Sequence, residues 1–237
     1  MGLVPIDQRP GPRTSARAVR VVREALSDAL GLLVPVSCGG CGAPDRAVCG
    51  ACRAALAPVP ARAPRPEIEA WAGLAYAGVA ARTIRSFKDE GRTDAAPALA
   101  PALRAALAAA CASAPRATGL ELAAVPSTAA ARRERGYEPL ALLVRHAGFR
   151  SVRVLRARER ADQAGLGRSA RRANADGAFA PVRRLDGRRF VLVDDVVTTG
   201  STLAAAARAI RSAGGSVGAV AVLAHTPLRI PVHHLND

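Results

Sequence analysis

The sequence predicts an α/β fold in which a parallel sheet is flanked by helices, with a small separate module near the N-terminus. Short unbroken apolar runs, Phe190–Val193 above all, are typical of strands buried on both faces of a parallel sheet. Ala/Leu-rich segments such as residues 94–114 alternate with these runs and predict the flanking helices. Two C-x-x-C pairs within residues 38–52 indicate the small module.

Composition limits both the size of the fold and the class of its partners. The chain has 237 residues, enough for one α/β domain and a small appendage, and 50% of them are hydrophobic. Only 3% are aromatic, so Ala, Val and Leu must form the core. Basic residues outnumber acidic ones by 34 to 19, and the net charge of +15 favours phosphates, nucleic acid or another anionic partner. Charge alone does not choose among these partners.

The chain divides into four predicted segments. Residues 1–17 form a disordered tail, and residues 18–56 contain an amphipathic helix followed by the four-cysteine module. Residues 57–66 form a Pro-rich linker, and residues 67–237 form the α/β domain. No apolar run reaches the ~20 residues of a membrane helix. Asp28 interrupts the apolar segment after the tail, which argues against a secretory signal, so we expect a cytoplasmic protein.

Four cysteines form the candidate metal site of the N-terminal module. Seven residues rich in turn formers separate the two C-x-x-C pairs, and four thiolates can close a tetrahedral structural zinc site. Two disulfides are the alternative, which a cytoplasmic location disfavours, and redox-active pairs are a weaker one. The predicted zinc ligands are Cys38, Cys41, Cys49 and Cys52.

A pair of acids followed by a hydroxyl-rich turn forms the candidate ligand site. Asp194 and Asp195 follow the Phe190–Val193 strand, at the end where open α/β sheets bind ligands. The turn that follows leads into a helix near Leu203 and offers an anion backbone N–H groups, hydroxyls and the helix dipole. Acids for ribose hydroxyls beside a cradle for phosphate predict a phosphorylated sugar as ligand. The alternative is an ordinary strand followed by a polar loop. The turn consists of Thr198, Thr199, Gly200, Ser201 and Thr202.

Other basic residues are further candidates. Lys88 is the only lysine among 34 basic residues, which hints that its compact ammonium matters, although a solvated surface charge is the simpler interpretation. The polar stretch between the predicted strands Val152–Leu155 and Phe190–Val193 contains several arginines. It is long enough to be a functional lid over a polyanion or a disordered basic loop.

The acids and the turn strongly resemble the phosphoribosyl pyrophosphate (PRPP) signature of type I phosphoribosyltransferases. The whole chain resembles the ComF family, which joins a zinc-ribbon-like four-cysteine module to a phosphoribosyltransferase-like domain. Glu138 and Pro139 depart from the Asn-Gln that is common in relatives. The resemblance rests on the four cysteines, Phe87-Lys88 before Gly91, Arg135-Gly136-Tyr137, Gln163 with Arg171 and Asn174, Phe179, and the signature.

The resemblance implies a role for each candidate. Asp194, Asp195 and Lys88 would be catalytic, with the acids on the ribose hydroxyls, and Thr198 to Thr202 would hold the 5′-phosphate. The candidates for the pyrophosphate loop are Ser127, Arg132, Arg133, Arg135, Gln163 and Arg171, with a solvated helix start as the alternative for the arginines after Ser127. Mg²⁺ would accompany PRPP.

Three functions remain open from the sequence. The first is Mg²⁺-dependent phosphoribosyl transfer to an unidentified acceptor. The second is a non-catalytic adaptor that senses PRPP or a nucleotide. The third is single-stranded DNA binding in natural transformation, in contact with DNA-uptake proteins. Thr198 stands where relatives that act on 6-oxopurines carry an acid, which argues against such a substrate.

Overall fold

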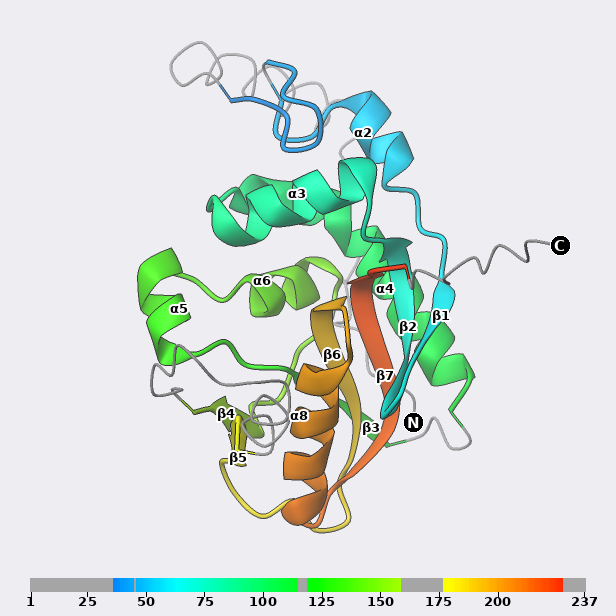
Figure 1. Cartoon of the computed structure of the whole chain (residues 1–237), viewed down its shortest axis with the longest axis vertical. Helices are drawn as coiled ribbons and strands as arrows, with labels where there is room; N and C mark the ends of the chain where they lie inside the picture. Colours follow the sequence, from blue (N-terminus) through cyan, green and yellow to red (C-terminus); the bar gives the residue numbers. More distant parts are fainter. Residues whose placement is uncertain (1–35, 45, 115–118, 159–176, 228–237) are drawn as a thin grey trace, which may run out of the picture.

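The computed structural model describes residues 36–44, 46–114, 119–158 and 177–227 (Figure 1). The predicted tail 1–17 and the predicted helix 17–33 lie outside the described residues, as do Gln163, Arg171 and Asn174.

A five-stranded, mostly parallel sheet forms the centre of the molecule, which confirms the predicted fold class. The strand order is β1-β2-β7-β6-β3, and only β1 runs antiparallel to its neighbour. The buried run Phe190–Val193 lies in β6, next to the centre of the sheet, as its uninterrupted apolar character predicts. The strands are β1 (Ala61–Arg65), β2 (Ile68–Ala75), β3 (Leu120–Ala124), β6 (Arg189–Val197) and β7 (Ser216–His225).

Helices cover both faces of this sheet and its carboxyl end. Figure 1 shows α8 (Ser201–Ser212) in front of the sheet and α4 (Ala96–Ala112) behind it. The helix α3 (Gly78–Asp89) lies across the carboxyl ends of the parallel strands, with the cysteine-containing segment above it. Two shorter helices, α5 (Ala129–Arg135) and α6 (Pro139–His146), follow β3. The candidate residues therefore gather at one end of the sheet.

The core is built from small aliphatic side chains, as the composition predicts. Alanines of α4 and α8 pack directly on the sheet, and Phe87 and Phe190 are its fully buried aromatic residues among those described. Gly73 in β2 shows how closely the layers approach, because a Cβ atom there would overlap the backbone carbonyl of Ala102 in α4. An alanine-rich core thus requires and permits unusually close backbone packing.

Three local predictions differ from the structure. The strand β1 lies inside the predicted linker, where Pro64 is tolerated because β1 is an edge strand. The strand predicted at Val152–Leu155 is instead β4 (Leu155–Ala157), paired antiparallel with the unpredicted β5 (Phe179–Pro181). The arginines assigned to the pyrophosphate loop instead form a helix, α5, which ends where Gly136 adopts the left-handed conformation with a φ of 73°.

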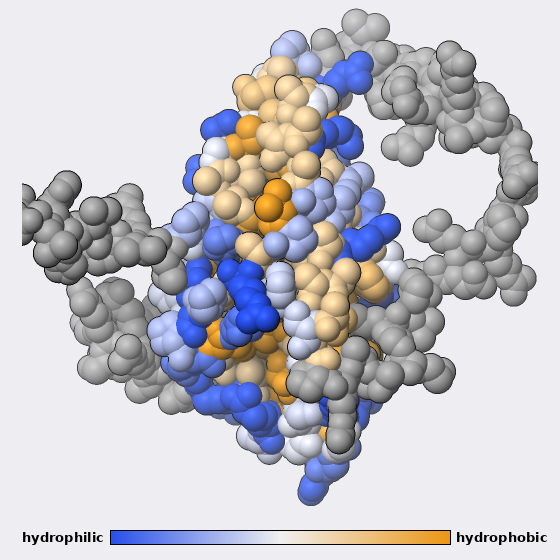
Figure 2. Space-filling model, turned by 90° about the vertical axis from the view of Figure 1, so that its right-hand side faces the viewer, coloured by the Kyte–Doolittle hydropathy of each residue, from blue (hydrophilic) through white to orange (hydrophobic). Residues whose placement is uncertain are grey.

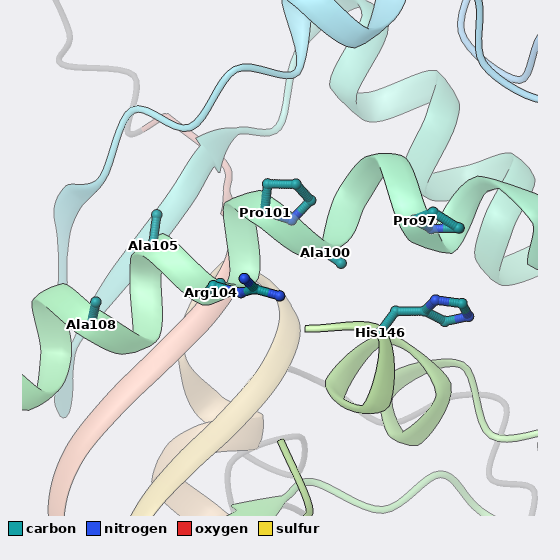
Figure 3. A pocket seen from close by; sticks show the side chains of 7 residues that line it. All are labelled: Pro97, Ala100, Pro101, Arg104, Ala105, Ala108 and His146. Atoms are coloured by element: carbon teal, nitrogen blue, oxygen red, sulfur yellow. The ribbon is translucent and has the colours of Figure 1, made fainter. Parts of the chain in front are cut away.

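By length and composition alone, one described helix could cross a membrane, although charged residues interrupt its apolar sequence. The segment Thr93–Ala112 is mainly apolar but contains Asp94 and Arg104, and 56% of its most apolar 18 residues is buried inside the protein, where α4 packs on β2 and β7. Its outer side forms a groove of about 460 Å³ with α6, shown in Figure 3. The groove is lined by Pro97, Ala100, Pro101, Arg104, Ala105, Ala108 and His146, none of which is a predicted site residue.

The surface carries few large apolar side chains. Figure 2 views the molecule from the right-hand side of Figure 1 and shows strongly hydrophilic residues beside a pale, weakly apolar band. Among the described residues, Val59 and Val182 are the large hydrophobic side chains that are exposed. The apolar character of the surface therefore comes mainly from small residues.

Candidate active site and metal centre

The two acids lie where β6 extends beyond its neighbour β3. The pairing of β6 with β3 ends at Val193, whereas its pairing with β7 continues to Val197. Asp194 and Asp195 therefore belong to the strand itself, but they lie beyond its pairing with β3. This is the carboxyl end of the parallel strands, where α/β folds bind ligands.

Lys88 reaches Asp195 from the last turn of α3. Its Nζ atom lies 2.6 Å from Oδ2 of Asp195, and 35% of the lysine side chain and 18% of the aspartate side chain are exposed. Burial opposes the charge, but the carboxylate of Asp195 outweighs it and raises the pKa of Lys88. The structure thus places the single lysine in a half-buried ion pair with a predicted site acid, rather than on an open surface.

The pKa of Asp194 is also raised, but for a carboxyl group this shift favours the uncharged form. Burial, reinforced by repulsion from Asp195, raises the pKa of Asp194 to about 8, although the Asp195 N–H and Lys88 favour its charged form. Its Oδ1 accepts a hydrogen bond of 2.9 Å from the Asp195 N–H, and Oδ1 of Asp195 accepts one of 2.7 Å from the Val196 N–H. Burial and the neighbouring carboxylate therefore favour the protonated form of Asp194 at neutral pH.

The hydroxyl-rich turn leads from β6 into the first turn of α8. Thr198, Thr199, Ser201 and Thr202 are exposed. Oγ of Ser201 lies 3.1 Å from Oγ1 of Thr199, which also accepts a hydrogen bond of 3.4 Å from the Ser201 N–H. Exposed hydroxyls at the N-terminus of a twelve-residue helix suit an anion.

Gly200 precedes α8 in the left-handed conformation, with a φ of 83°. The sequence suggests that a glycine here lets the backbone approach an anion. The structure gives a different reason, because a Cβ atom would lie 2.9 Å from Cβ of Arg65 and 3.1 Å from Cγ2 of Ile68. Gly200 is therefore packed against the β1–β2 hairpin.

The predicted pyrophosphate residues Ser127, Arg132, Arg133 and Arg135 lie in or just before α5. Arg135 pairs with Asp89 at 3.3 Å, next to Lys88 in the chain. The Tyr137 hydroxyl donates a hydrogen bond to the Phe87 carbonyl. The last turn of α3 therefore connects the acids of β6 with the end of α5.

Glu138, one of the two departures from the ComF pattern, contacts a predicted ligand residue. Its Oε1 lies 3.4 Å from Nη1 of Arg132, and both side chains are partly exposed. An exchangeable surface ion pair of this kind is weak. Arg132 thus has a carboxylate partner that a bound phosphate would have to replace.

Sequence reasoning missed Arg65, which is 8% exposed at the end of β1. Its guanidinium donates hydrogen bonds to the carbonyl oxygen of Thr198, which begins the turn, and to that of Thr226, which follows β7. The residue lies in the predicted linker, 133 positions from Thr198, so no local pattern could have revealed it.

The four predicted zinc ligands converge. The Sγ atoms of Cys38, Cys41, Cys49 and Cys52 all lie within 4.8 Å of one another, and those of Cys41 and Cys49 are 3.7 Å apart. A tetrahedral zinc ion with Zn–S distances of about 2.3 Å separates its sulfur atoms by about 3.8 Å. The cluster can therefore bind a metal such as zinc, and all five cysteines of the chain are free of disulfides.

Backbone N–H groups favour the ionised form of one of these thiols, which is the form that binds a metal. Burial opposes ionisation of Cys38, but N–H groups of Cys49, Cys41 and Gly40 lower the pKa of its thiol to about 6. The N–H groups of Cys49 and Gly40 lie 3.3 and 3.4 Å from its sulfur. Burial raises the pKa of Cys52, as expected for a neutral thiol beside an ionised one.

The cluster rests on α3, the helix that also carries Lys88. A Cβ atom on Gly40 would lie 3.0 Å from Cγ1 of Val79, and one on Gly39 would lie 3.1 Å from Oγ of Ser86. Nε of Arg82 donates a hydrogen bond to the Gly40 carbonyl. One helix therefore supports the candidate metal centre on one side and the acids on the other.

We expect about one zinc ion per chain in protein purified with zinc, because one closed four-thiolate site is present. Cys52→Ser should lose the metal and lower the melting temperature, since a structural zinc contributes directly to folding. Cys111→Ser, outside the cluster, is the matched control and should keep both. Elemental analysis and thermal melts measure this. A folded, zinc-replete wild type without stoichiometric metal would contradict the assignment.

Comparisons with known proteins find similarity to phosphoribosyltransferases. Residues 135–234 match the phosphoribosyl transferase domain family. A stretch of 39 residues, 16% of this chain, is 59% identical to adenine phosphoribosyltransferases of Mycobacterium avium (strain 104) and Mycolicibacterium paratuberculosis. The match spans 22% of each relative, about a fifth of its length.

A similar solved structure is that of Mycobacterium tuberculosis H37Rv orotate phosphoribosyltransferase in complex with Fe(III) dicitrate. It is 16% identical in sequence, with a TM-score of 0.33, over 73% of this chain and 96% of that one. The family match includes Asp194, Asp195 and the turn from Thr198 to Thr202. The chain is thus similar to phosphoribosyl transferase domains over residues 135–234, the stretch that contains both acids and the turn.

Proposed function

We propose that this chain is a PRPP-binding, phosphoribosyltransferase-like protein of the ComF family that transfers the phosphoribosyl group to an unidentified acceptor. One observation carries the proposal: within the matched domain, the acids of β6 lie at the open end of the sheet and directly precede the turn into α8. A ribose carrying a 5′-phosphate needs these two kinds of partner next to each other.

Each part of the site has a task in this proposal. The carboxylates of Asp194 and Asp195 accept hydrogen bonds from the vicinal ribose hydroxyls, and the turn holds the 5′-phosphate. Carboxylate oxygens are also ligands that suit Mg²⁺, which would neutralise charge on the pyrophosphate as it leaves. The Lys88 ammonium, 2.6 Å from Asp195, balances the charge of the acids before the ligand arrives.

Arginines on α5 complete the donor site. Arg132 and Arg135 already pair with carboxylates, so a pyrophosphate group would replace Glu138 and Asp89 as their partners. The bond from ribose C1 to the pyrophosphate oxygen then breaks towards an oxocarbenium-like state, and an acceptor nucleophile forms the new bond at C1. In this mechanism the protein chiefly positions the donor and stabilises charge.

An assay of pyrophosphate release tests the catalytic part. Purified protein with PRPP and Mg²⁺ is offered a panel of bases and amines, beside the double variant Asp194→Asn/Asp195→Asn. We expect release that needs one class of acceptor and disappears in the double variant. PRPP binding without release with any acceptor would instead support the adaptor that senses PRPP or a nucleotide.

The net charge of +15 favours a second role in binding single-stranded DNA. We propose that this role belongs to natural transformation and takes place in the cytoplasm. We propose sequence-tolerant phosphate contacts, because aromatic residues for base stacking are few. Neutralising Arg168, Arg171 and Arg172, which lie outside the described residues, should flatten the slope of log affinity against log salt. An unchanged slope would exclude these arginines from the DNA contact.

A further inference from the structure

Arg65 is a buried cation whose partners are backbone carbonyl groups. Its Nη2 donates to the Thr226 carbonyl at 2.7 Å and to the Val197 carbonyl at 3.5 Å, and its Nε donates to the Thr198 carbonyl. Its Nη1 donates to the Pro64 carbonyl at 2.7 Å. Among the described residues, none of its hydrogen-bond partners is a carboxylate. Burying a charge without a counter-ion is costly, so a fold that keeps one there needs a compensating gain.

The carbonyl groups that Arg65 holds belong to the beginning of the phosphate turn. Val197 ends β6, Thr198 begins the turn, and Thr226 directly follows β7. In a planar trans peptide, the C=O of one residue and the N–H of the next point in opposite directions. The Val197 carbonyl also accepts a hydrogen bond of 3.0 Å from the Thr226 N–H, so the pairing of β6 with the end of β7 already fixes that peptide group. By holding the Thr198 carbonyl on its own side, Arg65 directs the N–H group of Thr199 to the other side.

The β1–β2 hairpin that carries Arg65 also contacts α8 and the glycine before it in two further places. A Cβ atom on Gly200 would lie within 3.1 Å of both Cγ of Arg65 and Cγ2 of Ile68, so the hairpin touches the turn directly. Two turns further along α8, Nη1 of Arg208 lies 2.5 Å from Oε2 of Glu67. The β1–β2 hairpin therefore acts as a clamp on the first two turns of α8, from Gly200 to Arg208.

We infer that Arg65 is a positioning residue for the phosphomonoester of a ribose 5-phosphate ligand. It fixes the peptide groups of the turn so that their N–H groups converge on the phosphate, and its charge adds positive potential beside the helix N-terminus. The inference rests on the proposed function, because it assigns the phosphate to the same turn. The phosphate dianion is the anion that this buried cation lacks within the protein.

Calorimetric titration with two ligands tests the inference. Ribose 5-phosphate uses the turn, whereas pyrophosphate uses the arginines of α5 in the proposed function. Arg65→Met should lower the affinity for ribose 5-phosphate by about tenfold or more. Its affinity for pyrophosphate should stay within about twofold of that of the wild type. Arg65→Lys keeps the charge but loses the fork of donors, so its affinity for ribose 5-phosphate should lie in between.

Arg62→Met is the matched control on the same strand. Arg62 is exposed, pairs with Glu69 at 3.4 Å and lies over the Trp71 ring, so this variant should bind both ligands as the wild type does. If Arg65→Met does not fold, as judged by its melting curve, Arg65→Lys decides by the same criterion.

The outcomes separate the inference from the proposed function. A wild type that binds no ribose 5-phosphate overturns the proposed function and the inference with it. If the wild type binds but the Arg65 variants keep its affinity for ribose 5-phosphate, the inference alone is overturned. An equal loss of affinity for both ligands also overturns the inference, because Arg65 would then support the fold as a whole rather than the phosphate turn.

Discussion

Asp194→Asn is expected to stabilise the ligand-free protein while removing most of its affinity for a ribose phosphate. Burial raises the pKa of Asp194 from its ordinary value of 3.8 to about 8. Between about pH 4 and pH 8 the folded protein therefore keeps a proton that the unfolded chain has released. The unfolded state binds fewer protons there, so stability falls as the pH rises through this window, and asparagine removes the penalty.

The gain in stability from Asp194→Asn should grow with pH. Each pKa unit corresponds to about 1.4 kcal/mol, and since Asp194 keeps part of its surface exposed we expect roughly 2 kcal/mol at pH 8 and less at pH 5. Thermal melts of both proteins at the two pH values measure the difference. Asp195→Asn is the neighbouring control and should give no such gain, because it removes the partner of Lys88. An equal change at both pH values would contradict the assigned pKa.

Gly200→Ala should destabilise the fold far more than the same change at another left-handed glycine. Gly200 and Gly187 have φ values of 83° and 69°, so alanine is strained by about 1 kcal/mol at each. Only at Gly200 would the new Cβ atom also collide with Arg65 and Ile68, whereas nothing lies within 4 Å at Gly187. Overpacking adds ~1–3 kcal/mol, so we expect a loss of about 3 kcal/mol at Gly200 and about 1 kcal/mol at Gly187.

Urea denaturation with a common slope compares the two variants. The additional loss in free energy of unfolding at Gly200, relative to Gly187, measures the contact between the hairpin and the turn. Equal losses would mean that the hairpin can move away at little cost, which would also weaken the clamp described for Arg65.

The sequence allowed prediction of the features that depend on local patterns. The apolar run of β6, the acids after it and the turn into α8 lie next to one another in the chain, so their order alone predicts their arrangement. The two C-x-x-C pairs likewise bring their four thiols together through short turns. Each of these features needs few long-range contacts.

The features that escaped prediction depend on contacts between distant segments. β1 contains a proline and lies in a stretch that resembles a linker, so only its pairing with β2 makes it a strand. The contacts of α3 with α5, such as Asp89 with Arg135, join residues 46 positions apart. Which arginine would be buried, and against which carbonyl groups, follows only from the folded hairpin.

Calorimetric titration of PRPP in the presence of Mg²⁺ tests the central claim most directly. The wild type should bind, and Asp194→Asn/Asp195→Asn should weaken binding by about 2 kcal/mol or more, since hydrogen bonds to charged groups are worth ~1.5–3 kcal/mol. Below pH 8 the wild type should also release protons on binding, because the ligand's hydroxyls require the ionised form of Asp194. Equal affinity for PRPP in the wild type and the folded double variant would show that the acids of β6 are not the ligand site.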